Sequence, residues 1–162
     1  MDAHFTFSPA GPDDLPAVYA LIDSRIRWMQ ARGNPQWDTY RAAYPDSYFE
    51  TITNERRLWL LKSGSRIAAM ASLWDSDEKW TDGAPALYLH NLAADAAFPG
   101  AGAELLRRCA ERARLLGRDR LRLDCSARNP RLNDYYEALG FAFVAALPGS
   151  VYYQPNLREK IL

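Results

Sequence analysis

Residues 87–106 read LYLHNLAADAAFPGAGAELL, and this stretch decides the fold. Apolar residues alternate over Leu87–His90 as in a β-strand, and the alternation breaks at Asn91, which indicates a bulge or a fully buried strand end. Gly100 and Gly102 follow, directly before an apolar stripe with helical spacing. The stretch therefore predicts a strand, a glycine loop and a helix in succession.

The two glycines have two competing explanations. Glycine destabilises a helix interior by roughly 0.5–1 kcal/mol relative to alanine, so a pair at the helix start needs a reason. One reason is tight turn geometry. The other is a phosphate that approaches the helix N-terminus, where N–H groups without intrahelical partners favour anions. A Rossmann fingerprint would need a glycine where Leu105 stands, and the Gly-Lys-Ser/Thr of a Walker loop is absent. The local sequence leaves both explanations open.

The composition is that of one globular domain over residues 1–162. Hydrophobic residues make up 48% of the chain and charged residues 25%. Lys+Arg and Asp+Glu number 20 each, so there is no electrostatic reason to expect nucleic acid or a membrane surface as partner. The chain shows neither a signal-peptide pattern nor an apolar run of membrane-span length. Cys109 and Cys125 fall on faces expected to be buried and lack metal-ligand spacing, so we expect a cytoplasmic protein without a metal.

Hydrophobic periodicity along the chain predicts the element order β-α-α-β-β-β-α-β-α-β-β, an α+β fold of mixed α/β layers. The expected strands cover residues 4–10, 57–62, 66–74, 84–95, 120–127, 141–147 and 150–156. The expected helices cover residues 13–33, one short segment within 34–52, the stretch from the glycines to Gly117, and residues 129–140.

Caps and apolar stripes give these helices their expected orientation. Asp13 and Asp14 are expected to cap the first helix, and Asn129, before Pro130, is expected to cap the last. The helix after the glycines should bury Leu105, Leu106, Cys109, Ala110, Ala113 and Leu116. The last helix should bury Leu132, Tyr135, Tyr136 and Leu139.

Residues 87–144, which include RLRLDCSARNPRLNDYYEALGF, resemble the GNAT superfamily of acetyl-CoA-dependent N-acetyltransferases. The resemblance implies a central, splayed, mostly antiparallel sheet flanked by helices, with acetyl-CoA in the cleft that the splay opens. The family's pyrophosphate loop, Arg/Gln-x-x-Gly-x-Gly/Ala, maps onto residues 97–102, where both glycines match and Ala97 replaces the leading Arg or Gln. The cofactor-binding residues implied here are Leu92, Ala93, Ala94, Gly100, Ala101, Gly102, Ala103 and Glu104.

A second family motif, Asn-x6-Tyr-Glu-x-x-Gly-Phe, falls on Asn129 and on residues 136–141. The resemblance implies that the Asn129 side chain contacts the pantetheine arm and that Tyr136 protonates the departing CoA thiolate. From the residues alone, Asn129 is explained as a helix N-cap and Tyr136 as a core aromatic. The motif in register favours the functional interpretation of Tyr136.

Direct attack of an amine on the thioester needs a polarised carbonyl and a base. The backbone N–H near Leu92, at the irregular end of the strand, is the candidate oxyanion donor. His90 is the favoured base, because it lies on the same strand and imidazole titrates near neutral pH. Asp124 and water are the alternatives. A hydrogen-bonded structural role remains open for His90, as does an ion pair with Arg122 or a neighbouring arginine for Asp124.

The arginine-rich N-terminal helices carry Trp28 and Trp37, our candidates for the wall of the acceptor site. Packing between helices explains the same tryptophans equally well. We therefore expect acetyl transfer from acetyl-CoA to the amine of a small molecule, with an aromatic or acidic part, by a monomer or homodimer. The alternatives are a peptide or protein N-acetyltransferase and a non-catalytic acyl-CoA-binding or interaction domain on the same fold.

Overall fold

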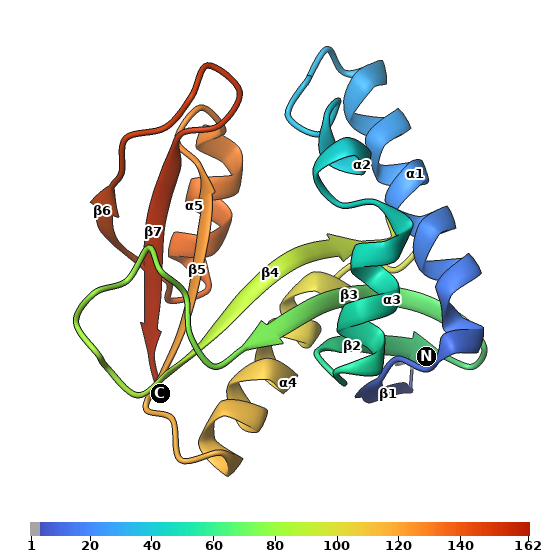
Figure 1. The fold of residues 1–162 in the computed structure, drawn as a ribbon, viewed down its shortest axis with the longest axis horizontal. Coiled ribbons are helices and arrows are strands. Elements are labelled where there is room, and N and C mark those ends of the chain that lie inside the picture. The colour runs from blue at the N-terminus through green and yellow to red at the C-terminus, as the bar shows by residue number, and fades with distance from the viewer. Residues whose placement is uncertain (1–3) are drawn as a thin grey trace. The chain divides into compact units, whose positions relative to one another are not determined.

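The computed structural model describes residues 4–162 and shows the expected mixture of helices and strands (Figure 1). The elements in chain order are β1 (Phe5–Pro9), the 3-10 helix η1 (Pro12–Asp14), α1 (Leu15–Ala31), α2 (Tyr40–Ala43), α3 (Asp46–Asn54), β2 (Leu58–Ser63), β3 (Arg66–Trp74), β4 (Ala86–Ala94), α4 (Ala101–Leu115), β5 (Arg120–Ser126), α5 (Pro130–Ala138), β6 (Ala142–Ala146) and β7 (Pro155–Ile161). None of the helices in this part of the chain has the length and apolarity needed to cross a bilayer.

The strands form one sheet in the order β1-β2-β3-β4-β5-β7-β6. The pairs β1–β2, β2–β3, β5–β7 and β6–β7 are antiparallel, and β4–β5 is parallel. The parallel pairing joins Ala86–Tyr88 to Arg120–Arg122, whereas β4 runs on to Ala94 and β5 to Ser126. This mixed, mostly antiparallel sheet confirms the expected fold class.

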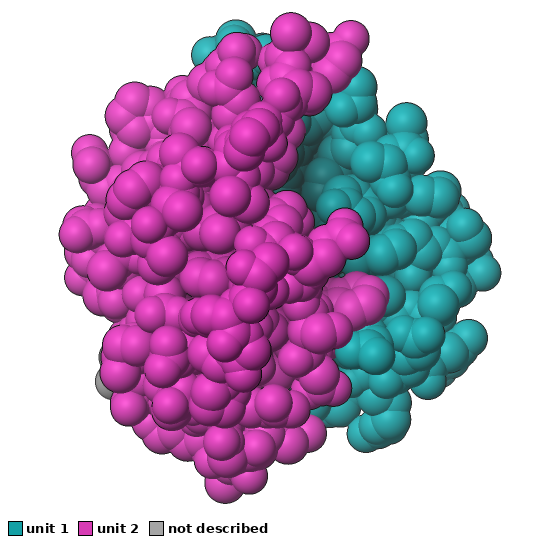
Figure 2. All heavy atoms as spheres, turned by 60° about the vertical axis from the view of Figure 1, so that its left-hand side comes forward, with its two compact units in different colours: residues 1–72, 91–106 teal, residues 73–90, 107–162 magenta. Residues whose placement is uncertain are grey.

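The chain forms two compact units, shown in different colours in Figure 2. The first contains the N-terminal part of the chain up to Ser72 together with Asn91–Leu106. The second contains Leu73–His90 and Arg107–Leu162. The strands β3 and β4 and the helix α4 each begin in one unit and end in the other. That the chain behaves as a single domain stays a prediction.

In the first unit, α3 packs on β2 and α1 packs on α3. Each of these elements buries apolar side chains completely or nearly so, and each such side chain contributes about 1.5–3 kcal/mol through the hydrophobic effect. The fully buried residues include Val18, Ile22, Phe49, Ile52, Leu58 and Leu60.

The N-terminal helices differ from expectation at two points. Asp14 lies at the N-cap of α1 but makes no side-chain cap hydrogen bond; its carboxylate accepts the backbone N–H of Gly11 at 2.8 Å and pairs with Lys62 at 2.5 Å. The segment expected to hold one short helix holds two, α2 and α3, because Pro45 lies between them. A proline disfavours helical geometry in the residue before it, so the helix cannot continue through Tyr44.

In the second unit, α5 packs on β5 and β6, and its buried face is not the expected one. Tyr136 is buried as expected, but Tyr135 is 39% exposed, and Asn133, which was not expected on the buried face, is buried. The Asn133 side chain donates to the carbonyls of Ser126 and Asn129 at 2.9 Å each, which satisfies its polar group. Leu116, expected on the buried stripe of α4, lies beyond the end of that helix and is 45% exposed.

The last strand is also misplaced by the sequence prediction. Residues 150–154 lie in a loop, where Val151 and Tyr152 are exposed, and β7 runs instead over Pro155–Ile161. The charged residues of β7 interrupt the apolar pattern by which a strand is predicted from sequence. They are stabilised there by partners from distant segments. Arg158, for example, is buried while it donates to the Phe141 carbonyl at 2.8 Å and pairs with Glu137.

Candidate functional site

Three titratable side chains of the second unit converge: His90 from β4, Asp124 from β5 and Asp77 from the loop between β3 and β4. His90 Nε2 lies 2.8 Å from Asp77 Oδ2, and His90 Nδ1 lies 3.9 Å from Asp124 Oδ1. The exposed fractions are 24% for His90, 5% for Asp77 and 8% for Asp124. A hydrogen bond from Nε2–H to the carboxylate assigns the proton to Nε2 and makes Nδ1 the basic nitrogen.

Asp77 is held as an ionised carboxylate. Its Oδ1 accepts the backbone N–H of Lys79 at 2.9 Å, and the Lys79 ammonium lies 3.8 Å from the same oxygen. Burial alone would raise the pKa of Asp77, but the hydrogen bonds from His90 and from the Lys79 backbone, with the Lys79 charge, lower that pKa below its usual value. Asp77 can therefore orient His90 and stabilise an imidazolium.

Asp124 is held by a tyrosine. The Tyr153 hydroxyl donates to Asp124 Oδ2 at 2.5 Å, and Asp124 Oδ1 is buried without a hydrogen-bond partner among the described residues. Lys79 Nζ lies 3.7 Å from Oδ1. Burial and the neighbouring Asp124 charge raise the pKa of Tyr153, so its hydroxyl stays protonated and continues to donate. We call Asp77, Lys79, His90, Asp124 and Tyr153 the His90 cluster.

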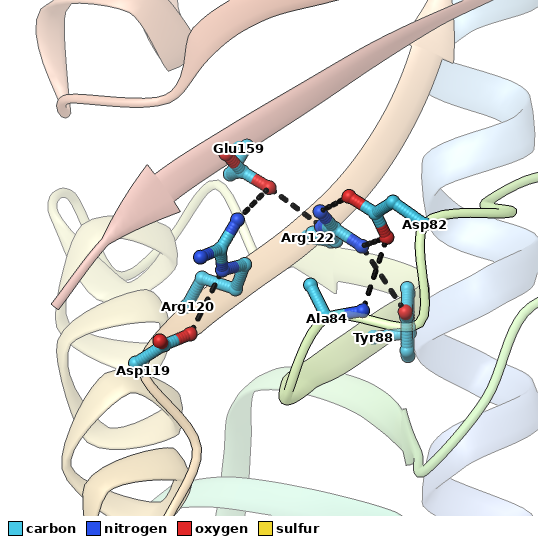
Figure 3. Close-up of polar contacts among 7 residues, drawn as sticks. All are labelled: Asp82, Ala84, Tyr88, Asp119, Arg120, Arg122 and Glu159. Carbon is cyan, nitrogen blue, oxygen red and sulfur yellow. Dashed lines mark hydrogen bonds and ion pairs between the residues drawn. The ribbon is translucent and has the colours of Figure 1, made fainter.

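Arg122 fixes the loop that carries Asp77 and Lys79. Figure 3 shows its contacts with Asp82 of that loop and with Glu159 of β7. Its side chain, 1% exposed, donates to both carboxylate oxygens of Asp82 in that loop, at 2.8 and 2.6 Å. It also donates to Glu159 at 2.6 Å, and its guanidinium lies 4.1 Å from the centre of the Trp80 ring. Arg122 therefore pairs with Asp82 and Glu159 rather than with Asp124, which belongs to the His90 cluster.

Three residues of the His90 cluster are of the types that bind metal ions. Asp77, His90 and Asp124 each offer one ligand atom, all within 4.8 Å of one another. However, the Lys79 ammonium already lies 3.8 and 3.7 Å from the two carboxylates, and His90 is hydrogen-bonded to Asp77. A divalent cation bound to these three residues would be repelled by Lys79 and would have to break the hydrogen bond between His90 and Asp77, whereas proton transfer needs neither change.

The residues of the second sequence motif also lie in this unit. Tyr136 is buried, and burial raises the pKa of its hydroxyl, which stays protonated at neutral pH. The Asn129 side chain accepts the backbone N–H of Leu132 at 3.1 Å, which confirms its role as the N-cap of α5. Its contact with pantetheine and the acid role of Tyr136 stay predictions.

In the first unit, the irregularity expected at Asn91 is a left-handed residue inside β4, with a φ of 57°. Asparagine tolerates this conformation better than most residues. Its Oδ1 accepts the hydroxyls of Tyr48 and Ser72 at 2.8 Å each, and its Nδ2 donates to the Tyr40 hydroxyl at 2.9 Å. This buried network fixes the backbone immediately before Leu92.

Turn geometry explains Gly100, one of the two glycines at the start of α4, but not Gly102. Gly100 has a φ of 84° and therefore serves the turn, whereas Gly102 lies inside the first turn of α4. The N–H groups of Ala101 and Glu104 donate to the carbonyls of Phe98 and Gly100, at 3.1 and 3.0 Å. The N–H groups of Gly102 and Ala103 belong to the first helical turn, where amides lack intrahelical acceptors. Among the amides from Gly100 to Glu104, those of Ala101 and Glu104 are therefore already hydrogen-bonded.

The two candidate acceptor tryptophans have different surroundings. Trp37 stacks on Tyr40 with ring centres 4.3 Å apart and an interplanar angle of 13°, which connects it to the Asn91 network. Trp28 is 38% exposed, and the guanidinium groups of Arg25 and Arg32 lie 4.3 and 3.8 Å from the centre of its ring. Only Trp37 is therefore connected to a residue of β4.

Sequence reasoning missed three members of the His90 cluster. Asp77 and Lys79 lie in a segment without periodicity, and Tyr153 was assigned to a strand that does not form. Each contributes through one side chain that meets its partner across a long sequence separation, and no local pattern marks such a meeting.

The sequence profile of the acetyltransferase (GNAT) family matches residues 20–141. The uncharacterized N-acetyltransferase YesJ of Bacillus subtilis is 25% identical over 151 residues, which cover 88% of this chain and 84% of that protein. The solved GNAT-family acetyltransferase of Listeria monocytogenes has a TM-score of 0.78 at 21% identity, with 98% of this chain and 95% of that chain covered. The PaiA N-acetyltransferase of Thermoplasma acidophilum, solved with coenzyme A, has a TM-score of 0.74 at 14% identity, with 98% and 99% covered.

Proposed function

Because this chain belongs to the acetyltransferase (GNAT) family, we propose that it acetylates the amino group of a small molecule by direct attack of the amine on acetyl-CoA. A related fold solved with coenzyme A supports acetyl-CoA as the donor. The observation that carries the proposal is the 2.8 Å contact between His90 Nε2 and Asp77 Oδ2. A histidine oriented by an ionised carboxylate is suited to take a proton from an amine.

In this proposal, His90 is the general base and Tyr136 the general acid. The raised pKa of Tyr136, caused by its burial, supports the acid role, because an acid must carry its proton when the thiolate leaves. The backbone N–H of Leu92 polarises the thioester carbonyl. Asp124, the alternative base, lies 3.9 Å from His90 Nδ1.

The proposed acetyl-CoA site consists of residues at the end of β4 and the start of α4, with Asn129 at the pantetheine arm. The pyrophosphate is bound mainly by the N–H groups of Gly102 and Ala103, because the first turn of a helix favours anions. The remaining proposed cofactor residues are Leu92, Ala93, Ala94, Gly100, Ala101 and Glu104. Trp37 and Trp28 are proposed to contact the acceptor, with Trp37 favoured by its stacking on Tyr40.

The test is thiol release from acetyl-CoA with a panel of small amines and of peptides with unblocked N-termini. We expect small amines to be acetylated and His90→Gln to lower kcat/KM by about 10²–10⁴-fold, the usual range for a general base. His4→Gln, which changes the other histidine of the chain, is the matched control and should keep full activity. Peptides acetylated in preference to every small amine would contradict the proposed substrate class.

Asp77→Asn tests whether His90 needs the carboxylate beside it. The lowered pKa of Asp77 keeps its negative charge over the whole neutral range, where the carboxylate accepts the hydrogen bond from His90. Asparagine has nearly the same size but no charge, so kcat/KM for thiol release at neutral pH should fall at least about tenfold. Activity within about twofold of wild type in a folded Asp77→Asn enzyme would contradict the proposed role of the pair.

A further inference from the structure

We propose that Arg158 of β7 positions Tyr136 for the protonation of the departing thiolate. The proposal rests on the proposed function, in which Tyr136 is the general acid, and deepens it by naming the side chain that fixes this acid. Arg158 acts through its contacts with α5 and not on the reacting atoms, so it is a positioning residue.

The contacts between Arg158 and α5 are the first argument. The Arg158 side chain is 8% exposed, and its Nε donates to Asn133 Oδ1 at 3.1 Å. Its Nη1 pairs with the Glu137 carboxylate and donates to the backbone carbonyl of Phe141 at 2.8 Å. These three partners follow one another along the chain at intervals of about one helical turn. One guanidinium group therefore holds the helix on both sides of Tyr136.

The hydrogen bonds of Asn133 are the second argument. Besides Arg158, its Oδ1 accepts the side-chain amide of Asn156 in β7 at 3.1 Å. Its Nδ2 donates to the carbonyls of Ser126 in β5 and of Asn129, the N-cap of α5, at 2.9 Å each. The amide cannot rotate without breaking several of these bonds in a buried place, where lost bonds are costly. Asn133 therefore joins Arg158 to the start of the helix that carries Tyr136.

The surroundings of Tyr136 are the third argument. Its carbonyl accepts the backbone N–H of Phe141 at 2.9 Å, and its ring meets the Phe141 ring edge to face, with centres 5.9 Å apart. Arg158 binds the carbonyl of the same phenylalanine, so a shift of the guanidinium is passed on to Tyr136.

The choice of a charged residue supports the same interpretation. Burying an arginine carries a desolvation penalty, and an apolar side chain of similar volume often gives equal stability. The carboxylate partner of Arg158, Glu137, is 61% exposed, so this ion pair contributes less than a fully buried one. An apolar side chain cannot, however, bind Asn133, Glu137 and the Phe141 carbonyl at once, as the planar guanidinium does.

The experiment measures Arg158→Met in two backgrounds, wild type and Tyr136→Phe, by thiol release from acetyl-CoA with a small amine. In the wild-type background kcat should fall at least about tenfold, because a displacement of about 1 Å at a catalytic group costs up to about 10²-fold. In the Tyr136→Phe background there is no hydroxyl left to position, so the same change should alter kcat by less than about threefold. The KM for acetyl-CoA should change by less than about threefold in both backgrounds, because Asn129 keeps its own cap bond to Leu132.

Arg122→Met is the matched comparison, because it also removes a buried arginine but acts on the loop that carries Asp77. It should lower thiol release by the same factor in both backgrounds, since its effect does not pass through the Tyr136 hydroxyl. If Arg158→Met also lowered kcat by equal factors in the two backgrounds, Arg158 would contribute stability alone and the proposal would be overturned.

Arg158→Lys provides the same test if Arg158→Met does not fold. Lysine keeps the positive charge beside Glu137 but has no second nitrogen with which to bind Asn133. It should lower kcat at least about fivefold in the wild-type background and less than about twofold in Tyr136→Phe, and equal factors again overturn the proposal. A wild-type protein that releases no thiol with any amine contradicts the proposed function and the acid role of Tyr136 with it, whereas equal factors contradict the role of Arg158 alone.

Discussion

Tyr135 and Tyr136 are neighbours on α5 with opposite surroundings. Tyr136 is 5% exposed and Tyr135 is 39% exposed, and the two rings touch edge to face with centres 5.5 Å apart. The pair is therefore an internal comparison, because each can lose its hydroxyl without losing its ring.

We predict that Tyr136→Phe lowers kcat by about 10²–10⁴-fold, because the departing thiolate loses its proton donor. Acetyl-CoA binding and the melting temperature should change little, since the ring and its contact with Phe141 remain. The measurement is thiol release with a working amine. Tyr135→Phe should be nearly silent, and a Tyr136→Phe enzyme within about threefold of wild type would leave Tyr136 as a packing residue.

At the scale of elements, the start of α4 carries a glycine that the turn does not require. Gly100 has the positive φ of the turn, while Gly102 lies within the helix. In a helix interior alanine is more stable than glycine by roughly 0.5–1 kcal/mol, so the backbone conformation of Gly102 does not oppose an alanine there. A bound phosphate, in contrast, tolerates no negatively charged side chain at that position.

We predict that Gly102→Glu weakens acetyl-CoA binding at least about tenfold, because its carboxylate meets the pyrophosphate at the helix N-terminus. Gly102→Ala is the matched control and should raise the unfolding free energy while it keeps most of the affinity. Calorimetric titration of both folded variants with acetyl-CoA is the measurement. If Gly102→Glu and wild type bound acetyl-CoA with equal affinity, the pyrophosphate would not bind at the N-terminus of α4.

The loop between β3 and β4 is held by a single buried cation. Arg122 is 1% exposed and pairs with Asp82 and Glu159, whereas Arg120 nearby is 25% exposed and pairs with Asp119 and Glu159. The Arg122 guanidinium holds the pKa of the Asp82 carboxyl well below its usual range. The Asp82 side chain is 53% exposed, but Glu159 is 16% exposed, so losing Arg122 leaves a largely buried carboxylate without this partner, whereas exposed pairs contribute little.

We predict that Arg122→Met lowers the unfolding free energy by about 3 kcal/mol and that Arg120→Met lowers it by less than about 1 kcal/mol. Denaturant unfolding at neutral pH measures both. Because the same loop carries Asp77, Arg122→Met should also reduce kcat/KM. Equal stability of the two variants would show that Arg122 does not anchor the loop.

At the scale of the whole molecule, three elements run through both compact units. A strand or helix that is continuous through two units couples their unfolding, because its hydrogen bonds break together. We predict one cooperative transition in calorimetry, with equal calorimetric and van't Hoff enthalpies, and an upward shift of the melting temperature with acetyl-CoA. Two separate transitions, with only one shifted by acetyl-CoA, would instead define two domains.

The sequence by itself determined the succession of strands and of most helices, the cap of α5 and the irregularity in β4. Asn129 caps α5, Gly100 adopts a positive φ, and Asn91 breaks the regularity of β4, as the local patterns predicted. These features depend on interactions within a few residues, so the local sequence contains their cause. The two motifs, one over residues 97–102 and the other from Asn129 to Phe141, identified the family for the same reason, because the spacing within each motif is local.

Only the tertiary structure decided where charge is buried. The strand Pro155–Ile161 was missed because its charged residues are paired with distant segments, and on α5 Asn133 is buried while Tyr135, which was expected to be buried, is exposed. Asp77 and Tyr153 reach the His90 cluster from loops, where no periodicity marks them. A buried charge is stable only with its partner, and the partner is chosen by the fold; the sequence names the charged residue but not the residue that will face it.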